Sequence, residues 1–240
     1  MALKNDGTVL AWSSNDHGQL GDGTKVNRLS PIPVSGGLSF KQIAAGSVTT
    51  CGLTTDGAVY CWGRHGVPGS ETIPMPFGPT LRFTSITLGG YHACGITIDS
   101  DGYCWLVGGG GAAPGDQSNP YRIAGNFKFT QLQGYYGSTC GRTIDERTYC
   151  WGQNRFAQTG APPSETVNQP FLVADSSFHG TLVGGVTTET TCAITSAGEL
   201  RCFGGGKWAM ANPIGLTTCT LDRYQSGPCR RTSAHALVEP

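Results

Sequence analysis

The chain has 240 residues, and its sixteen basic and sixteen acidic side chains give a formal net charge of zero. A chain of this length can bury a sizeable core, and its balanced charge excludes nucleic-acid binding through a basic surface. Charged residues make up only 13% of the chain, while 37 Gly and 14 Pro interrupt it throughout. This composition leaves little room for helices and predicts an all-β protein. No apolar run is long enough for membrane insertion, and the N-terminus lacks the layout of a secretory signal.

The first predicted element is an N-terminal hairpin, MALKNDGTVLAW, which turns at Asp6-Gly7 and ends in Trp12. Similar hairpins bracketed by cysteines begin at Cys51, Cys94, Cys140 and Cys192, and read CGLTTDGAVYCWG, CGITIDSDGYCWL, CGRTIDERTYCWG and CAITSAGELRCFG. In the first of these, a three-residue turn with Gly57 in the left-handed conformation places Cys51 opposite Cys61. Opposed strand residues have Cα atoms about 4.5–5.5 Å apart, which a disulfide can bridge.

The cysteines therefore predict disulfides. Zinc sites space their ligands two to four residues apart, whereas none of these pairs has a CxxC or a nearby His. Free core thiols are the other alternative, but the first hairpin replaces both cysteines together, with Met1 and Ala11. Oxidised cysteines imply an oxidising compartment, so the missing signal suggests a trimmed chain or a piece of a longer precursor. The predicted pairs are Cys51–Cys61, Cys94–Cys104, Cys140–Cys150, Cys192–Cys202 and Cys219–Cys229, the last as a stapled loop.

Each hairpin belongs to a longer repeat unit. The aromatic residue after the second cysteine position recurs from Trp12 to Phe203 with spacings of 50, 43, 46 and 52 residues, which is the period of a propeller. Apolar segments led by phenylalanine precede the four cysteine hairpins and predict the inner strand of each unit; they begin at Phe40, Phe83, Phe129 and Phe178. Proline-marked segments at 31–34, 120–123 and 170–173 suit an outer edge strand. Units of about four short strands must then stack radially.

Two segments carry a family resemblance. Residues 12–23, WSSNDHGQLGDG, and 151–160, WGQNRFAQTG, each follow a hairpin and resemble the regulator of chromosome condensation repeat. That family folds as a β-propeller, commonly of seven blades, so the resemblance implies a propeller over residues 1–205. The cysteine-bracketed hairpins depart from the nuclear founder and resemble secreted bacterial members and the ectodomain of crinkly-type receptor kinases. Chromatin binding and nucleotide exchange are therefore not expected of this chain.

We thus predict one all-β domain over residues 1–240, a β-propeller of about five four-stranded blades with a disulfide in each central hairpin. The repeats fall at approximately 1–50, 51–93, 94–139, 140–191 and 192–237. Five units either close into a ring or form part of a seven-bladed array, and the sequence does not decide between the two.

No motif indicates catalysis. The glycine run from Gly108 follows no strand–helix pattern, and Gly204–Lys207 lacks the Ser or Thr of a phosphate loop. The five histidines are scattered, and no Asp-Gly cluster supplies the acidic residue that closes a calcium loop. We therefore expect no enzymatic activity, no cofactor and no metal site.

Large side chains that break the repeat pattern are the candidate partner-binding residues. Arg, Tyr and Trp most often anchor interfaces, and a propeller's variable loops gather on one rim. Packing between blades is the alternative for each of them. The candidates are Arg64, His65, Tyr135, Tyr136, Arg155, Phe156 and Trp208.

The predicted function is a secreted, cell-surface or periplasmic propeller that binds another protein on one rim, as an adhesion, receptor or inhibitor module. One alternative is a glycan-binding propeller that stacks sugars on Trp or Tyr. Another is an enzyme with Asp or His in the central channel, which the Gly, Ala, Leu and Ile of the predicted inner strands disfavour.

Overall fold

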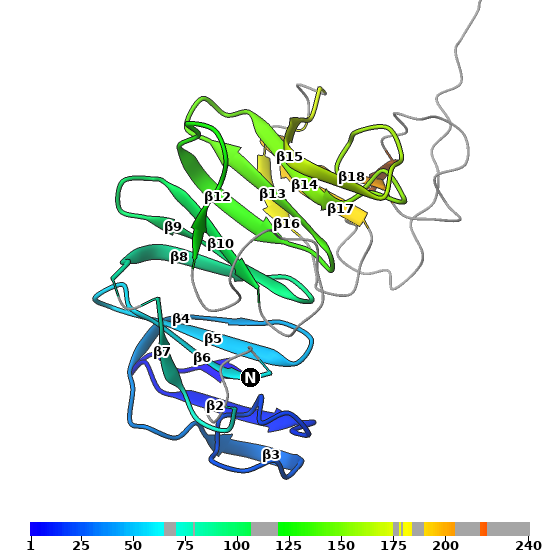
Figure 1. Ribbon diagram of the computed structural model, residues 1–240. Helices are drawn as coiled ribbons and strands as arrows, with labels where there is room; N and C mark the ends of the chain where they lie inside the picture. The colour runs from blue at the N-terminus through cyan, green and yellow to red at the C-terminus, as the bar shows by residue number, and fades with distance from the viewer. Residues whose placement is uncertain are drawn as a thin grey trace, which may run out of the picture.

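The computed structural model describes residues 1–64, 71–78, 80–106, 120–174, 178, 180–183, 190–204 and 217–219. Within these ranges the chain forms five antiparallel sheets and no α-helix, so no helix there is long and apolar enough to cross a membrane. Figure 1 shows the sheets in chain order, from the blue first sheet to the yellow last one, at opposite ends of the row. The all-β prediction is confirmed, and the five sheets form an open row.

Four sheets have four strands that pair in chain order, and the first strand of each lies beside the first strand of the next sheet. These inner strands correspond to the segments led by phenylalanine, as predicted. The second sheet contains β4 (Phe40–Ala45), β5 (Thr49–Thr54), β6 (Val59–Gly63) and β7 (Met75–Phe77); the third, β8 (Phe83–Leu88), β9 (His92–Thr97), β10 (Gly102–Leu106) and β11 (Tyr121–Arg122); the fourth, β12 (Phe129–Gly134), β13 (Ser138–Thr143), β14 (Thr148–Gln153) and β15 (Thr166–Leu172); the fifth, β16 (Gly180–Val183), β17 (Thr190–Thr195), β18 (Leu200–Gly204) and β19 (Thr217–Cys219).

The first sheet has three strands, where the sequence predicted about four: β1 (Ala2–Leu3), β2 (Val9–Ser13) and β3 (Arg28–Pro33). Ala2 lies opposite Leu10, which places Met1 opposite Ala11 as Cys51 lies opposite Cys61. The three strands therefore match the second, third and fourth strands of the other sheets. No strand led by phenylalanine precedes β1 in the described chain, and β1 itself lies beside β4.

Four of the predicted disulfides join facing residues of the second and third strands. Their Cα atoms are 4.0–4.1 Å apart, slightly closer than the expected 4.5–5.5 Å range. The bridges are Cys51–Cys61, Cys94–Cys104, Cys140–Cys150 and Cys192–Cys202. Cys219 lies on β19, the outer strand of the fifth sheet rather than a loop, and Cys229 lies outside the described residues. The fifth bridge therefore stays a prediction.

The turn of each hairpin has the predicted three-residue form. The Thr54 amide donates to the Ala58 carbonyl, and Gly57 has a φ of +85°. Ser100 and Glu146 hold the equivalent position with φ of 62° and 66°, although left-handed backbone disfavours side chains. The turn also contacts the following sheet, because the Phe83 amide donates to the Gly57 carbonyl at 2.8 Å.

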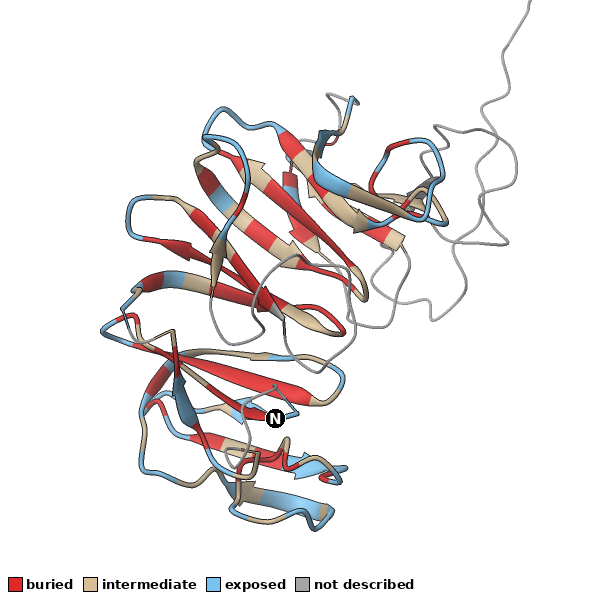
Figure 2. Ribbon diagram, viewed as in Figure 1, coloured by how far each residue is buried: buried red, intermediate tan, exposed pale blue. Residues whose placement is uncertain are grey.

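Aromatic side chains fill the space between neighbouring sheets. Trp62 and Trp105 are fully buried, and the Trp105 ring lies 5.3 Å from Phe77 and 5.6 Å from Phe83. Each buried aromatic removes roughly 150–250 Å² from water, so this packing stabilises the contact between sheets. Figure 2 shows the buried residues concentrated in the middle of the sheets and the exposed ones along outer strands such as β3.

The proline-marked segments form outer strands, as predicted. β3, β11 and β15 each lie at the edge of their sheet, opposite the inner strand or, in the first sheet, opposite β1. Pro31 and Pro33 lie within β3, and Pro170 lies within β15. Because proline has no N–H to offer a further strand, these edges resist pairing with another chain.

Candidate interaction surface

Strand direction places the described candidate residues on one face of the row of sheets. In an antiparallel sheet of four strands, the first-to-second and third-to-fourth connections leave from the same end. Tyr135 and Tyr136 follow β12, whereas Arg64 follows β6 and Arg155 and Phe156 follow β14. We call this end the tyrosine rim, and the opposite end, which carries the turns of the disulfide hairpins, the hairpin rim. His65 and Trp208 lie outside the described residues.

Tyr135 is buried, with an exposed fraction of 1%. Its hydroxyl lies 3.2 Å from the carbonyl oxygens of Val183 and Cys192 in the next sheet and donates a hydrogen bond toward them. Burial raises the pKa of Tyr135, so the phenol stays protonated and able to donate. Tyr135 therefore packs between sheets, which is the alternative role considered for it, and its side chain is not accessible to a partner.

Tyr136 and Tyr91 form a pair on the tyrosine rim. Their hydroxyl oxygens are 2.8 Å apart and their rings meet edge to face at 5.3 Å. The amide of Gly90 donates to the Tyr136 carbonyl at 2.9 Å, which joins the loops of the third and fourth sheets. Both tyrosines are partly exposed, so the pair presents aromatic surface on a rigid support.

The charged candidates lie on the same rim. The guanidinium of Arg155 forms an ion pair with Glu165 at 2.7 Å, and both side chains are more than half exposed. Arg64 is exposed, while its amide donates to Val48 and its carbonyl accepts from the Thr49 hydroxyl. An exposed pair adds little to stability, because water screens it, which leaves Arg155 available to a partner.

A buried asparagine holds the long loop that carries Arg155. Asn154 is fully buried; its side-chain amide donates to the Pro162 carbonyl at 2.7 Å and its oxygen accepts from the Thr159 amide at 3.0 Å. Asn15 does the same in the first sheet, where it accepts from the Leu20 amide. Both asparagines lie in the segments that carry the family resemblance, and their residue type alone does not indicate their role. Their shared position, three residues after Trp12 and Trp151, was the signal that could have revealed it.

These loops also attach to the following sheet. The Gln19 carbonyl accepts from the Trp62 indole N–H at 3.0 Å and from the Thr50 hydroxyl at 2.9 Å. The Gln158 carbonyl likewise accepts from the Thr191 hydroxyl at 2.7 Å. The tyrosine rim is therefore a connected surface rather than a set of independent loops.

A half-buried imidazole lies beneath this rim. Nε2 of His92 lies 2.7 Å from the Thr139 hydroxyl of the neighbouring sheet. Burial lowers the pKa of His92 to about 4, because the charged form would lose its hydration. The ring is therefore neutral near pH 7, and protonating it would disturb the contact between the third and fourth sheets.

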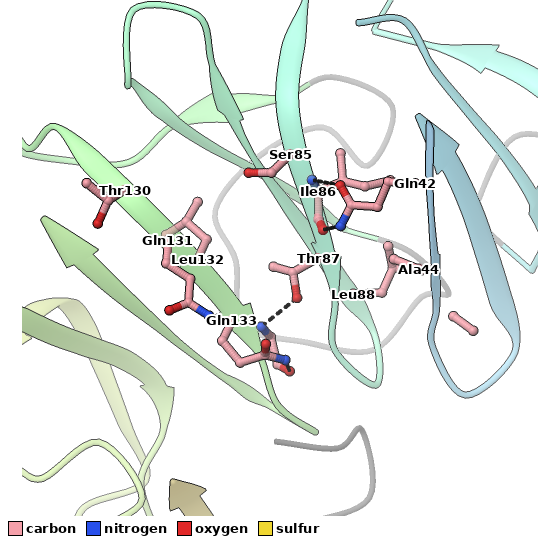
Figure 3. A pocket seen from close by; sticks show the side chains of 12 residues that line it. Gln42, Ala44, Ser85, Ile86, Thr87, Leu88, Thr130, Gln131, Leu132 and Gln133 are labelled. Carbon is pink, nitrogen blue, oxygen red and sulfur yellow. Dashed lines mark hydrogen bonds between the residues drawn. The ribbon is translucent and has the colours of Figure 1, made fainter. Parts of the chain in front are cut away.

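The inner strands β4, β8 and β12 line a pocket of about 530 Å³ (Figure 3). Its twelve lining residues offer amide, hydroxyl and aliphatic groups, among them Gln42, Ser85, Thr87 and Gln133. None of the described lining residues carries a carboxylate or an imidazole. The inner strands are also more polar here than the sequence suggested.

Comparisons with known proteins agree with this architecture. Residues 40–66 match the family described as "Regulator of chromosome condensation (RCC1) repeat". The "Ultraviolet-B receptor UVR8" of Arabidopsis thaliana is 37% identical over 65 residues, which is 26% of this chain and 15% of that receptor. The chain thus spans only a small part of this curated relative.

Solved structures share the fold. Prp20p from Saccharomyces cerevisiae superposes with a TM-score of 0.72 at 18% identity, covering 86% of this chain and 55% of that one. The ectodomain of the Physcomitrella patens receptor kinase CR4 gives a TM-score of 0.51 at 22% identity, covering 73% and 43%. The repeat match, the curated relative and the shared fold together support an RCC1-like repeat β-propeller, with the five sheets as its blades.

Proposed function

We propose that this chain is a secreted or cell-surface scaffold that binds another protein through the tyrosine rim and performs no catalysis itself. The observation that carries the proposal is the rim itself. The loops of Tyr91 and Tyr136 are joined by the Gly90–Tyr136 hydrogen bond, and the loop of Arg155 is held by the buried Asn154. Aromatic side chains with few rotatable bonds lose little entropy on binding, and aromatic and arginine side chains dominate interface energies. An RCC1-like propeller fits such a scaffold.

The extracellular assignment rests on the disulfides. Four bridges within hairpins require an oxidising compartment to form and persist. The likeness to the CR4 receptor ectodomain supports the same location. Mapping the disulfides of protein isolated directly from its native extracellular or periplasmic fraction tests it; recovery of the protein only in reduced form from the cytosol would overturn this part of the proposal.

A matched pair of arginines tests the rim. Proteins recovered from the extracellular fraction are purified and titrated against the oxidised chain and its variants. We expect Tyr136→Ala and Arg155→Ala each to weaken binding by about tenfold or more, the effect of losing an interface anchor. Arg147→Ala is the control, because Arg147 forms a similarly exposed pair with Asp145 on the hairpin rim. Equal losses on both rims, or none on the tyrosine rim, contradict the proposal.

The glycan alternative receives less support. Sugar stacking needs an exposed ring face. Trp62 and Trp105 are fully buried between sheets, so the rings that offer such a face include Trp12, which is 37% exposed, and the Tyr91–Tyr136 pair. A glycan array probed with the oxidised chain separates the two: saturable glycan binding that Tyr136→Ala abolishes would favour the lectin-like function over the protein partner.

A further inference from the structure

Two glutamine side chains connect neighbouring inner strands in the same way. Gln42 on β4 accepts from the Ile86 amide at 3.0 Å and donates to the Ile86 carbonyl at 2.8 Å. Gln131 on β12 accepts from the Leu182 amide at 2.8 Å and donates to its carbonyl at 2.7 Å. Each side-chain amide thus acts like the backbone of an adjacent strand, because it hydrogen-bonds both the N–H and the C=O of one residue on the inner strand of the next blade.

The blade between them lacks this glutamine. Strand register places Ser85 of β8 where Gln42 and Gln131 stand, since each directly follows the irregularity near the start of its strand. The backbone that a glutamine at Ser85 would bind is that of Leu132 on β12. Leu132 pairs with the residue that follows the first cysteine of its hairpin, and Ile86 and Leu182 hold the same position in their sheets. Among the described residues, no side-chain amide reaches the Leu132 backbone.

The Leu132 backbone groups face the gap. The amide of Gly134, two residues further along β12, donates to the Thr87 hydroxyl on β8 at 2.9 Å. Alternate residues of a strand point their N–H and C=O groups to the same side, so those of Leu132 also point toward β8. Ser85, Thr130 and Leu132 all line the 530 Å³ pocket, and Figure 3 shows them together with Thr87.

We propose that this gap between Ser85 and Leu132 binds a primary carboxamide, which takes the place of the absent glutamine side chain. A carboxamide presents one acceptor to the Leu132 amide and one donor to its carbonyl, as Gln42 and Gln131 do in the neighbouring gaps. A carboxylate presents only acceptors and leaves the Leu132 carbonyl facing negative charge. The site therefore selects the amide over the acid, and it does not depend on the tyrosine rim.

Amide-resolved NMR of the isotope-labelled, oxidised protein tests the site. Propanamide, which is the end of a glutamine side chain, is titrated with propanoate as the matched acid. We expect saturable shifts of the Leu132 and Gly134 amides with propanamide, in the millimolar range for so small a ligand, and none with propanoate. Equal shifts with both compounds, or no saturable shift at Leu132, would overturn the proposal.

Two variants identify the position. Ser85→Gln supplies the missing side chain and should reduce propanamide affinity by about tenfold or more, while the protein keeps its four mapped disulfides and its melting transition. Ser85→Ala leaves the gap open and should retain the wild-type affinity. Unchanged binding in Ser85→Gln would refute the assignment. A short peptide containing one glutamine, compared with the same peptide containing glutamate, then distinguishes a protein-borne amide from a free small molecule.

Discussion

Removing the Cys140–Cys150 bridge by changing both residues to alanine should lower the free energy of unfolding substantially. The bridge closes a loop with a sequence separation of 10. In the loop-entropy model, such a closure restricts the unfolded chain by about 2.7 kcal/mol at 25 °C. Both cysteines are fully buried, so losing their sulfur atoms adds a small packing cost, for a total of about 3 kcal/mol. In a chain of this size that corresponds to a melting temperature lower by roughly 6–12 °C.

Guanidinium unfolding followed by tryptophan fluorescence measures this difference, with the remaining bridges confirmed by mass spectrometry. The first sheet is the natural reference, because Met1 and Ala11 occupy these positions without a bridge. Four bridges together contribute about 11 kcal/mol, close to the whole stability of many domains, so fully reduced wild-type protein should not show a cooperative transition. A loss below about 1 kcal/mol in the variant, or cooperative melting of protein whose thiols have all been alkylated, would refute the reasoning.

Three further predictions concern the turns, the loops and pH. Ser100→Gly should raise the free energy of unfolding by about 1 kcal/mol in a denaturant titration, because Ser100 has a left-handed φ. The reverse change, Gly57→Ser, should lower the free energy of unfolding, because a Cβ there would lie 2.9 Å from the Phe83 carbonyl oxygen. Asn154→Ala should lower the free energy of unfolding by about 2 kcal/mol or more, because it leaves buried backbone groups unpaired. The control Asn126→Ala, at an exposed position, should change the free energy of unfolding little. Equal effects of the two substitutions would contradict the role given to Asn154. Because folding depresses the pKa of His92 to about 4, its contribution is constant above pH 6.5 and is lost as pH falls toward 4, by up to about 3 kcal/mol. The stability difference between wild type and His92→Gln, measured from pH 8 to pH 4, should show that loss, and a flat difference would argue against it.

The repeated chemistry of the sequence made much of the fold predictable. Cysteines ten residues apart fix a hairpin register, because a one-residue slip would turn one thiol to the other face. The segments led by phenylalanine and the proline-marked segments likewise located the inner and outer strands. The fourth strand of the last sheet was missed, because Thr217–Cys219 carries no proline and was assigned to a stapled loop.

The site was harder to predict, because it depends on which side chains face each other across blades. Tyr135 and Tyr136 are adjacent in sequence, yet one is buried against Val183 and the other lies on the rim with Tyr91. Nothing local distinguishes them; the difference arises from the position of the next sheet. The amide bridges of Gln42 and Gln131 span 44 and 51 residues, so pattern alone could not reveal them.

Each of the four described bridges closes within a single hairpin, and that bears on how the protein would mature if it is exported as proposed. A translocating chain exposes its segments in order, and both thiols of a hairpin emerge before any cysteine of the next one. Oxidation can then proceed one ribbon at a time with the correct partner always nearest, without the help of an isomerase to undo long-range mispairing. Under the proposed extracellular location, maturation should therefore tolerate loss of disulfide-isomerase activity but not loss of the primary thiol oxidant.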